Sequence, residues 1–365
     1  MCHRVIVRDE SHERAVHMQI STIGIDLAKN VFQVHGVDAA EKLVLKKQLR
    51  RSQVLEFFSK LSPCLVGLEA CATSHQWARE LKKLGHDVRL MPASYVKAYV
   101  KRGKNDAADA AAICEAVTRP SMHFVPIKSS EQQSALMLHR TRDLLICQRT
   151  QLINAMRAHL AELGLVARKG REGLQQLIRT VAEADDERLP SDACFACQAI
   201  IAQLQAVQIQ ITRLDKRIHQ AHRVNPASKR LEAIPGFGVI VSTAVVATMT
   251  DPKAFKTGRE FAAWIGLVPR QNSTGGKDRL GSISKQGDRY LRRLLIVGAL
   301  SVVKSARARP DKYPWIMTLL GRRPAKVVAV ALANKMARIA WAVLAKGETY
   351  RASAHTTSGA VAVST

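Results

Sequence analysis

The stretch Ser21-Thr-Ile-Gly-Ile-Asp26-Leu-Ala-Lys-Asn30 contains a short, mostly apolar run that ends in a carboxylate. A run of this length between polar residues predicts a buried strand with Asp26 at its end. The same arrangement recurs in Cys64-Leu-Val-Gly-Leu-Glu69-Ala, where a second buried strand would end at Glu69. Two carboxylates are therefore expected at the ends of two strands.

Two further acids lie in Lys-Asn-Asp106-Ala-Ala-Asp109-Ala, at the start of an alanine-rich stretch that predicts a helix with both acids on one face. Four gathered carboxylates repel one another strongly unless a cation lies among them. Oxygen ligands suit Mg²⁺ or Mn²⁺. Two such ions about 3.5–4 Å apart can activate a nucleophile and stabilise a leaving oxygen in phosphoryl transfer. These residues favour a metal-dependent enzyme that cuts nucleic acid.

The pattern around these acids predicts an α/β domain over residues 19–128. The expected strands are 21–26, 31–37, 42–48, 64–69 and 87–91, and the expected helices are 74–84, 94–101 and 106–118. Three successive strands followed by alternating helix and strand is the order of the ribonuclease H-like fold. In that fold, acids from the first strand, the fourth strand and a late helix converge.

The charge of the chain points to a polyanionic partner. The formal net charge is +26, and residues 223–365 carry 24 basic and 7 acidic groups. Scattered Lys and Arg on a solvated surface are the alternative interpretation.

The length of 365 residues allows two or three cores. No apolar run approaches the 18 or so residues of a membrane span and no signal peptide is evident, so we expect a cytoplasmic protein. Seven cysteines suit reduced thiols, and Cys194-Phe-Ala-Cys197 is only a weak zinc half-site, with packing the favoured interpretation.

Residues 1–18 are polar and predict a flexible extension, or an upstream start codon with Met18 as the natural start. Residues 129–222 predict helices throughout. Their last part contains an a/d seam with polar residues between, formed by Leu204, Val207, Ile211, Leu214, Ile218 and Ala221. An antiparallel partner in the same chain, such as residues 131–165, and an intermolecular coiled coil fit this seam equally well.

Residues 223–350 predict a second globular unit, followed by a disordered tail at 351–365. The unit opens with Ile-Pro235-Gly236-Phe-Gly238 before an apolar helix. This turn is similar to a helix-hairpin-helix motif, whose exposed backbone N–H groups hold a phosphate. Glycines that allow a tight helix crossing are the alternative.

A second chemical motif surrounds Ser273-Thr274-Gly275-Gly276-Lys277. The two glycines allow close approach of a phosphate to the backbone. The basic residues nearby could neutralise its oxygens; they are Arg270, Lys277, Arg279, Lys285 and Arg289. No histidine is adjacent to act as a base, so by these residues alone the loop is better explained as a phosphate clamp than as a nucleophile site.

The motifs together resemble those of the DEDD insertion-sequence transposases over about residues 20–350. They are Gly-Ile-Asp26-Leu-Ala-Lys-Asn, Gly-Leu-Glu69-Ala, Lys-Asn-Asp106-Ala-Ala-Asp109-Ala, Ile-Pro235-Gly-Phe-Gly238 and Gly-Leu-Val-Pro269-Arg-Gln-Asn-Ser273-Thr-Gly-Gly-Lys277. The resemblance implies an α/β ribonuclease H-like (RuvC-like) N-terminal domain, a helical coiled-coil insert and a mainly α C-terminal transposase domain.

The resemblance also implies roles for individual residues. Asp26, Glu69, Asp106 and Asp109 would be the metal-binding tetrad, and Ser273 would attack DNA and become linked to a phosphate. The resemblance therefore favours a nucleophile site over a phosphate clamp in this loop. Thr274, which follows directly, is the other hydroxyl that could attack. The family further implies a guide RNA, and a tetrad that works with the serine domain of another protomer in a dimer or tetramer.

Sequence reasoning therefore favours a DNA transposase or recombinase acting on element ends and target DNA. A RuvC-like junction resolvase or nuclease that uses only the tetrad is the main rival. A basic nucleic-acid-binding protein without catalysis would leave the order of the four acids and the serine loop unexplained.

Overall fold

The computed structural model describes residues 20–100, 105–183 and 188–351, and the chain forms two compact units, residues 1–133 and 134–365. The predicted extension at 1–18 and nearly all of the predicted tail at 351–365 lie outside the described residues. Each unit is described separately below.

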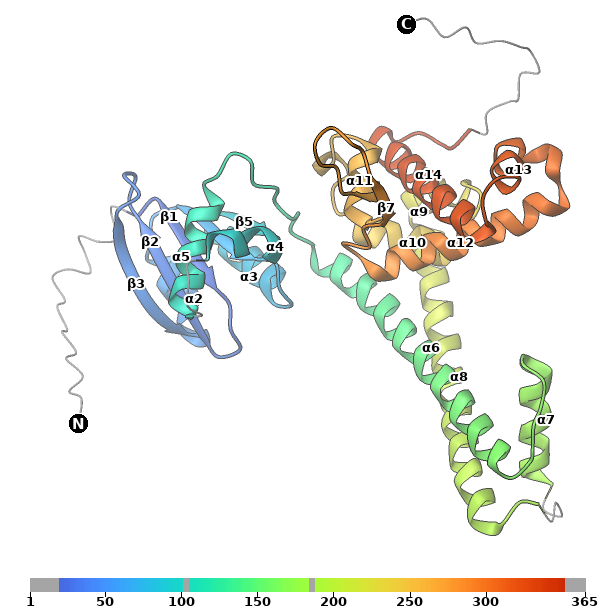
Figure 1. Cartoon of the computed structure of the whole chain (residues 1–365). Helices are drawn as coiled ribbons and strands as arrows, with labels where there is room; N and C mark the ends of the chain where they lie inside the picture. The colour runs from blue at the N-terminus through green and yellow to red at the C-terminus, as the bar shows by residue number, and fades with distance from the viewer. Residues whose placement is uncertain (1–19, 101–104, 184–187, 352–365) are drawn as a thin grey trace, which may run out of the picture. The chain divides into compact units, whose positions relative to one another are not determined.

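The first unit is built on a five-stranded mixed sheet (Figure 1). Its strands are β1 (Thr22–Asp26), β2 (Val31–Val37), β3 (Leu43–Arg50), β4 (Leu65–Glu69) and β5 (Asp87–Met91). The spatial order is β3-β2-β1-β4-β5, with β1 antiparallel to β2 and parallel to β4. All five predicted strands are confirmed to within two residues at each end.

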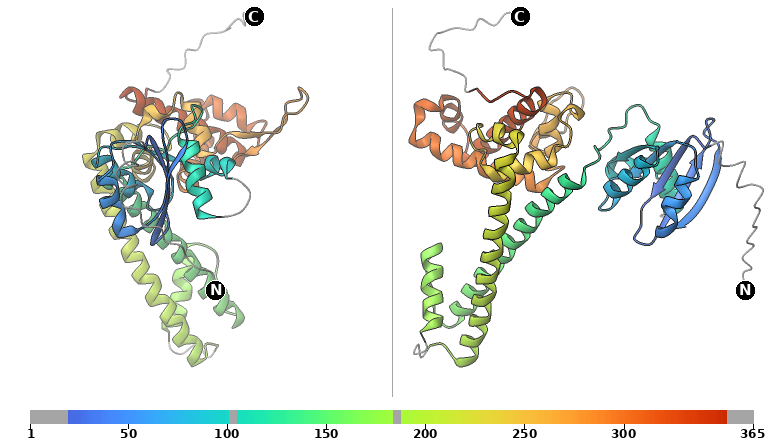
Figure 2. Two further views of the ribbon diagram at one scale, coloured as in Figure 1. Left: turned by 90° about the vertical axis from the view of Figure 1, so that its left-hand side faces the viewer. Right: turned by 180° about the vertical axis from the view of Figure 1, so that it is seen from behind.

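Helices cover both faces of this sheet (Figure 2, left). They are η1 (Arg51–Gln53), α2 (Val54–Ser59), α3 (Ser74–Lys83), α4 (Ala93–Val96), η2 (Lys97–Tyr99) and α5 (Asp106–Val117). Ile23 and Ile25 of β1 belong to one core with Phe58 of α2 and Leu81 of α3. Because strand side chains alternate, Gly24 faces the other side, against α5. The sequence pattern did not predict α2, whose short length gives little periodic signal. This mixed α/β arrangement is compatible with the ribonuclease H-like fold.

Long helices begin the second unit, as the sequence predicted. They are α6 (Ser130–Glu162), α7 (Arg171–Ala182) and α8 (Ser191–Val224). Polar contacts join α6 to α8 in antiparallel order, from Arg142 to Asp215 and from Arg149 to Gln208. The seam residues Leu204, Val207, Ile211 and Ile218 are buried, Leu214 is half-buried and Ala221 is exposed. The structure therefore favours the hairpin within the chain, and the seam ends before Ala221.

The remaining helices form one core with a small β-hairpin beside it. They are α9 (Pro226–Glu232), α10 (Val239–Thr248), η3 (Pro252–Ala254), α11 (Gly258–Ile265), α12 (Arg289–Ala308), η4 (Pro310–Lys312), α13 (Pro314–Leu320) and α14 (Ala325–Lys346), with β6 (Pro269–Gln271) and β7 (Leu280–Ile283). The core includes Phe261 of α11, Leu295 of α12 and Ala333 of α14, all fully buried. This unit is mostly helical, as expected.

Two helices in the described part, α8 and α14, are long and apolar enough to cross a membrane by length and composition. Counting uninterrupted apolar runs did not reveal them because polar residues interrupt both. The buried residues of α14 belong to the helical core, and those of α8 include the seam facing α6. Core helices of this kind meet the same criterion, so it carries little weight here.

Candidate metal centre and serine hairpin

Strand register brings Asp26 and Glu69 to the same side of the sheet. Gly24 of β1 lies beside Gly67 of β4 in the parallel pair, and a Cβ on either glycine would contact α5. Asp26 and Glu69 each follow two residues later on their strands, so their side chains point to the same face as the glycines. Both acids therefore lie at adjacent strand ends, on the side that α5 covers.

The close approach of α5 depends on Gly24. A Cβ at this position would lie 2.2 Å from the Ala110 carbonyl oxygen and 2.3 Å from the Cys114 nitrogen, both of them backbone atoms. At Gly67 a Cβ would meet the Val117 side chain at 2.9 Å. The two glycines let the helix rest directly on β1 and β4.

The first turn of α5 supplies the other two acids. Asn105 is the N-cap, and its side chain accepts a hydrogen bond from the Ala107 backbone N–H at 3.0 Å. Asp106 and Asp109 both fall in this first turn. The partial positive charge of a helix N-terminus stabilises carboxylates there, which offsets part of their mutual repulsion.

The acids from the strands and the helix converge. One carboxylate oxygen from each of Asp26, Asp106 and Asp109 can be chosen so that all three lie within 4.8 Å of one another. Glu69 is not part of this tightest group, but its charge still acts on the others. Burial, together with the negative charges of Asp109, Asp106 and Glu69, raises the pKa of Asp26 to about 6. Burial and Asp109 also raise the pKa of Glu69.

The donor set fits a hard divalent cation. All of the clustered atoms are carboxylate oxygens, two of the three acids in the tight group are half-buried, and the third is exposed. The raised carboxyl pKa values mean that the charged forms are disfavoured here, first by burial and then by the neighbouring carboxylates, so a positive charge would stabilise the ionised site. Mg²⁺ or Mn²⁺ would supply that charge with the ligand type it prefers.

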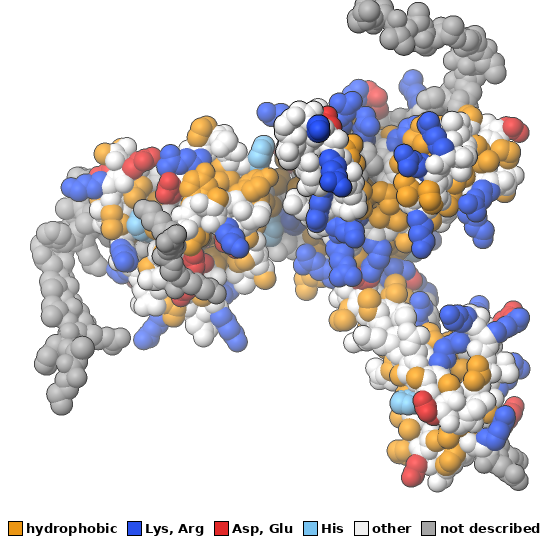
Figure 3. All heavy atoms as spheres, viewed as in Figure 1, with side chains coloured by type: hydrophobic (Ala, Val, Ile, Leu, Met, Phe, Trp, Pro, Cys, Tyr) orange, Lys and Arg blue, Asp and Glu red, His pale blue; other side chains and the backbone are white. Residues whose placement is uncertain are grey.

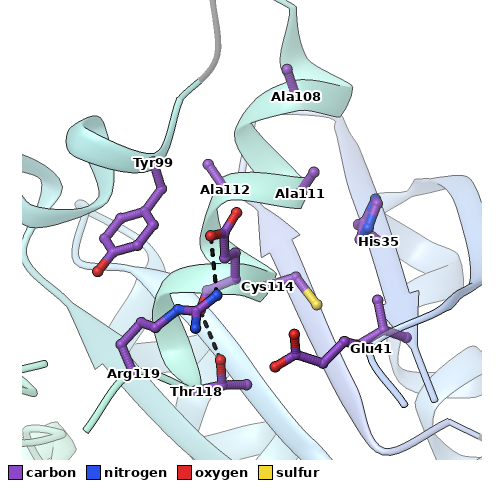
Figure 4. A pocket seen from close by; sticks show the side chains of 11 residues that line it. His35, Glu41, Tyr99, Ala108, Ala111, Ala112, Cys114, Thr118 and Arg119 are labelled. Atoms are coloured by element: carbon purple, nitrogen blue, oxygen red, sulfur yellow. Dashed lines mark hydrogen bonds and ion pairs between the residues drawn. The ribbon is translucent and has the colours of Figure 1, made fainter. Parts of the chain in front are cut away.

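A cavity of about 440 Å³ lies along another side of α5 (Figure 4). Its walls include Ala108, Ala111 and Ala112 of α5, together with His35 of β2 and Tyr99 of η2. At its lower end, Arg119 forms an ion pair with Glu115 at 3.1 Å. None of the four predicted ligands lines this cavity, so it is separate from the candidate metal centre.

The serine motif forms the tip of the β6–β7 hairpin, which extends from the C-terminal unit (Figure 2, left). Thr274 and Lys277 pair across the tip, and Gly275 and Gly276 have φ angles of 56° and 76°. Positive φ at both central residues is typical of a type I′ turn, which glycine adopts without strain. Every residue from Arg270 to Leu280 is exposed, so the tip is open to a partner.

This turn places Asp278 opposite Ser273. The antiparallel pairing that begins with Thr274 and Lys277 at the turn continues towards the base of the hairpin. There the Asn272 N–H donates to the Arg279 carbonyl at 2.8 Å. Ser273 Oγ donates a hydrogen bond to Asp278 Oδ1 at 2.8 Å. Gln271 Nε2 donates to both, at 3.0 Å to Ser273 Oγ and 3.1 Å to Asp278 Oδ1.

Sequence reasoning missed Asp278 and Gln271. It noted only that no histidine is adjacent to act as a base, whereas a carboxylate lies opposite Ser273 across the hairpin. The Thr-Gly-Gly-Lys turn was the signal that could have revealed it, because a two-residue loop fixes which residues lie opposite each other.

A buried arginine anchors the base of the hairpin. Arg292 of α12 donates to the Ile265 carbonyl at 2.7 Å and to the Gln286 carbonyl at 2.8 Å. Ile265 is the last residue of α11, so the arginine joins the end of that helix to the segment that leaves the hairpin. Lys285 in this segment adopts a left-handed conformation with φ of 56°.

The basic residues predicted around the loop are all exposed. Arg270 donates to the Ser284 carbonyl at 3.2 Å, while Lys277 and Arg279 lie at the tip and Lys285 and Arg289 lie near the base. Lys and Arg side chains are numerous on the visible face of the C-terminal unit (Figure 3). The hairpin therefore carries its hydroxyl within a cationic surface.

The Pro235-Gly-Phe-Gly238 turn is tightly packed at its first glycine. Gly236 has a φ of 87°, and a Cβ there would lie 2.9 Å from the Gly298 carbonyl of α12. This supports the tight-crossing alternative at Gly236. Gly238 begins α10 with no neighbouring atom within 4 Å of a Cβ, so only this end of the turn leaves room for a phosphate.

Comparison with known proteins agrees with the two-part architecture. Residues 23–164 match the DEDD transposase domain of the IS110 type, and residues 228–314 match the family described as "Transposase IS116/IS110/IS902 family". The chain thus matches insertion-sequence transposases that have a DEDD domain.

Curated relatives match over nearly the whole chain. A "Probable family 20 transposase" of Pseudomonas aeruginosa is 51% identical over 92% of this chain and 99% of its own length. The transposase for insertion sequence element IS1328 of Yersinia enterocolitica is 38% identical over 91% of this chain and 98% of its own. The transposase for IS1111A of Coxiella burnetii is 35% identical over 92% of each. This chain belongs to the IS110/IS116 transposase family.

Proposed function

We propose that this chain cuts and rejoins DNA strands for its insertion sequence, using a metal-binding tetrad and a serine nucleophile. Asp26, Glu69, Asp106 and Asp109 would hold Mg²⁺ or Mn²⁺, and Ser273 would attack the phosphodiester. The observation that carries the proposal is the convergence of acids from β1 and α5, with the charge of Glu69 of β4 also acting on Asp26, in the part of the chain that matches the DEDD transposase domain. The serine hairpin lies in the part that matches the second transposase family model. The metal would supply charge neutralisation at the reacting phosphate.

The residues of the hairpin suit transfer of a phosphoryl group to the protein. A bond would form between Ser273 Oγ and phosphorus, while the bond from phosphorus to one deoxyribose oxygen breaks. The serine hydroxyl loses its proton, and the released deoxyribose oxygen gains one and leaves as a hydroxyl. That ester keeps the energy that a later rejoining step needs. The exposed Arg270, Lys277 and Arg279 would stabilise the negative charge that develops on the phosphate oxygens.

The proposal includes the partners that the family resemblance implies. They are the element ends and target DNA, a guide RNA encoded beside the gene, and other copies of this chain in a dimer or tetramer. Within the chain, residues 19–128 would form the RuvC-like domain, 129–222 the helical insert and 223–350 the transposase domain. Action on cellular DNA would place the protein in the bacterial cytoplasm.

Trapping a protein–DNA adduct tests the nucleophile. Stopping the reaction with detergent should yield DNA attached to the protein, and peptide mass spectrometry should locate the attachment at Ser273 rather than Thr274. Ser273→Ala should eliminate the adduct, while Thr274→Ala, its matched control, should retain it. Free DNA ends without an adduct, undiminished in Ser273→Ala, would instead assign the reaction to the rival nuclease.

Mixing two inactive variants tests the cooperation between protomers. Asp106→Ala lacks a tetrad ligand and Ser273→Ala lacks the nucleophile, so neither should form the adduct alone. If a tetrad works with the serine of another protomer, the mixture should recover part of the activity, with the adduct only on Asp106→Ala chains. A mixture that stays inactive would place both sites within one protomer.

A further inference from the structure

A groove of about 700 Å³ lies between α11, α13 and α14, and no residue of the serine hairpin lines it. The lining residues come from all three helices and from the residue before α11; they are Thr257, Gly258, Arg259, Trp315, Ala331, Asn334, Lys335, Arg338, Ile339, Trp341 and Ala342. Ala331, Lys335, Arg338 and Ala342 follow the three- and four-residue spacing of one helix face, so α14 forms a continuous wall.

The charged groups of this groove are all cationic. Arg259, Lys335 and Arg338 are all exposed, and no acidic side chain is among the lining residues. Of these three, Arg259 comes from the first turn of α11 and the other two from the middle of α14. Cations brought together from separate helices without compensating acids favour an anionic ligand with several charges.

An exposed tryptophan stands at the same groove. Trp315 of α13 is 41% exposed, and Lys335 Nζ lies 4.7 Å from the centroid of its ring. Trp341, in contrast, is half-buried and donates from Nε1 to the Pro252 carbonyl at 3.0 Å. One indole is therefore part of the wall, while the other leaves much of its surface available for stacking beside a cation.

We propose that the groove between α11, α13 and α14 binds an unpaired segment of a nucleic acid strand. Arg259, Lys335 and Arg338 contact its phosphates, and Trp315 stacks on one of its bases. Aromatic rings that alternate with cations are the means by which proteins hold single strands without reading sequence. A duplex keeps its bases stacked inside and offers Trp315 no free face. The site rests on the proposed function only in that the chain handles nucleic acid.

Binding to labelled oligonucleotides tests the groove with the full-length protein. Fluorescence anisotropy would measure the affinity for fluorescein-labelled oligo(dT), oligo(rU) and a duplex of equal length. Trp315→Ala should weaken binding to single strands by about 5- to 150-fold, the range for losing one stacked base. Trp315→Phe should restore most of that loss, and binding to the duplex should change little.

The cations are tested by their effect on salt dependence. Lys335→Ala/Arg338→Ala should lower the slope of log affinity against log salt by about 1.4, since each phosphate contact in a single strand contributes about 0.7. Lys326→Ala/Lys346→Ala is the matched control, because it removes two exposed cations from the same helix outside the groove. All of these side chains are exposed, so thermal melting should show intact folding.

The outcomes separate this inference from the proposed function. Ser273→Ala should bind oligonucleotides as the unaltered protein does, because binding needs no strand cleavage. Stronger binding of oligo(dT) or of oligo(rU) would identify the strand as DNA or RNA, and either supports the site. Equal losses in the groove and control variants, or no loss in Trp315→Ala, would overturn it even if the adduct at Ser273 were found.

Discussion

Ser273 and Asp278 face each other across the β6–β7 hairpin, where the serine hydroxyl donates to the carboxylate at 2.8 Å. The pairing results from the Gly275-Gly276 turn, which fixes the register of the two strands. Gln271 donates to both groups from the same face. The proposed nucleophile is thus oriented by residues of its own hairpin.

Substitution of Asp278 should show whether this carboxylate only orients the Ser273 hydroxyl or also removes its proton. Asp278→Ala should slow adduct formation by up to about tenfold, the value of one modest hydrogen bond. Asp278→Asn should slow it less, because an amide oxygen still accepts the hydroxyl hydrogen. The measurement is the rate of adduct formation in single-turnover reactions. Equal and much larger losses in both variants would make Asp278 the base that removes the serine proton.

Divalent metal should stabilise the protein more at pH 7.5 than at pH 5. The folded pKa of Asp26, about 6, lies above its ordinary value of 3.8, so without metal this carboxyl contributes stability at low pH that is lost as pH rises through about 6. A bound cation replaces the proton. Thermal melting with and without Mg²⁺ at both pH values would measure the difference. Asp26→Asn should reduce the difference in Mg²⁺ stabilisation between the two pH values. If Mg²⁺ stabilised the unaltered protein equally at both pH values, the metal site would be contradicted.

Gly24→Ala should destabilise the N-terminal unit by about 1–3 kcal/mol or more, because its Cβ would overlap backbone atoms of α5 that cannot rotate away. Gly67→Ala is the graded comparison and should cost less, since the atoms it meets belong to the side chains of Val117 and Ile113. Chemical denaturation of both variants would test whether Gly24→Ala loses more stability than Gly67→Ala. Equal costs would mean that α5 can shift, and that its position over the strand ends is less constrained.

Ile211→Glu should destabilise the pairing of α6 with α8 by about 2–4 kcal/mol, since Ile211 is buried in the seam. Ile209→Glu is the matched control on the same helix, because Ile209 is 59% exposed and should tolerate the charge within about 0.5 kcal/mol. Urea denaturation and solution mass would be measured together. A stable Ile211→Glu protein with a reduced oligomeric mass would show that the seam joins two chains.

Local pattern was sufficient to predict most of the secondary structure. Alternating and continuous apolar runs located all five strands of the sheet, and Asp26 and Glu69 could be placed at strand ends because each ends such a run. The helical spacing of residues 204–218 likewise predicted α8. The helix α2 was missed because its six residues, Val54–Ser59, span less than two turns.

The partners of each element depended on the tertiary structure. The seam on α8 has the same spacing whether it meets α6 or another chain, and only the contacts of Arg142 and Arg149 distinguish the two. The Pro235-Gly-Phe-Gly238 turn fitted both phosphate binding and helix crossing until Gly236 was found against Gly298.

The groove beside Trp315 joins residues from three helices, whose proximity no local spacing encodes. Period and propensity act over a few residues, whereas charge convergence and packing arise between segments far apart in the chain.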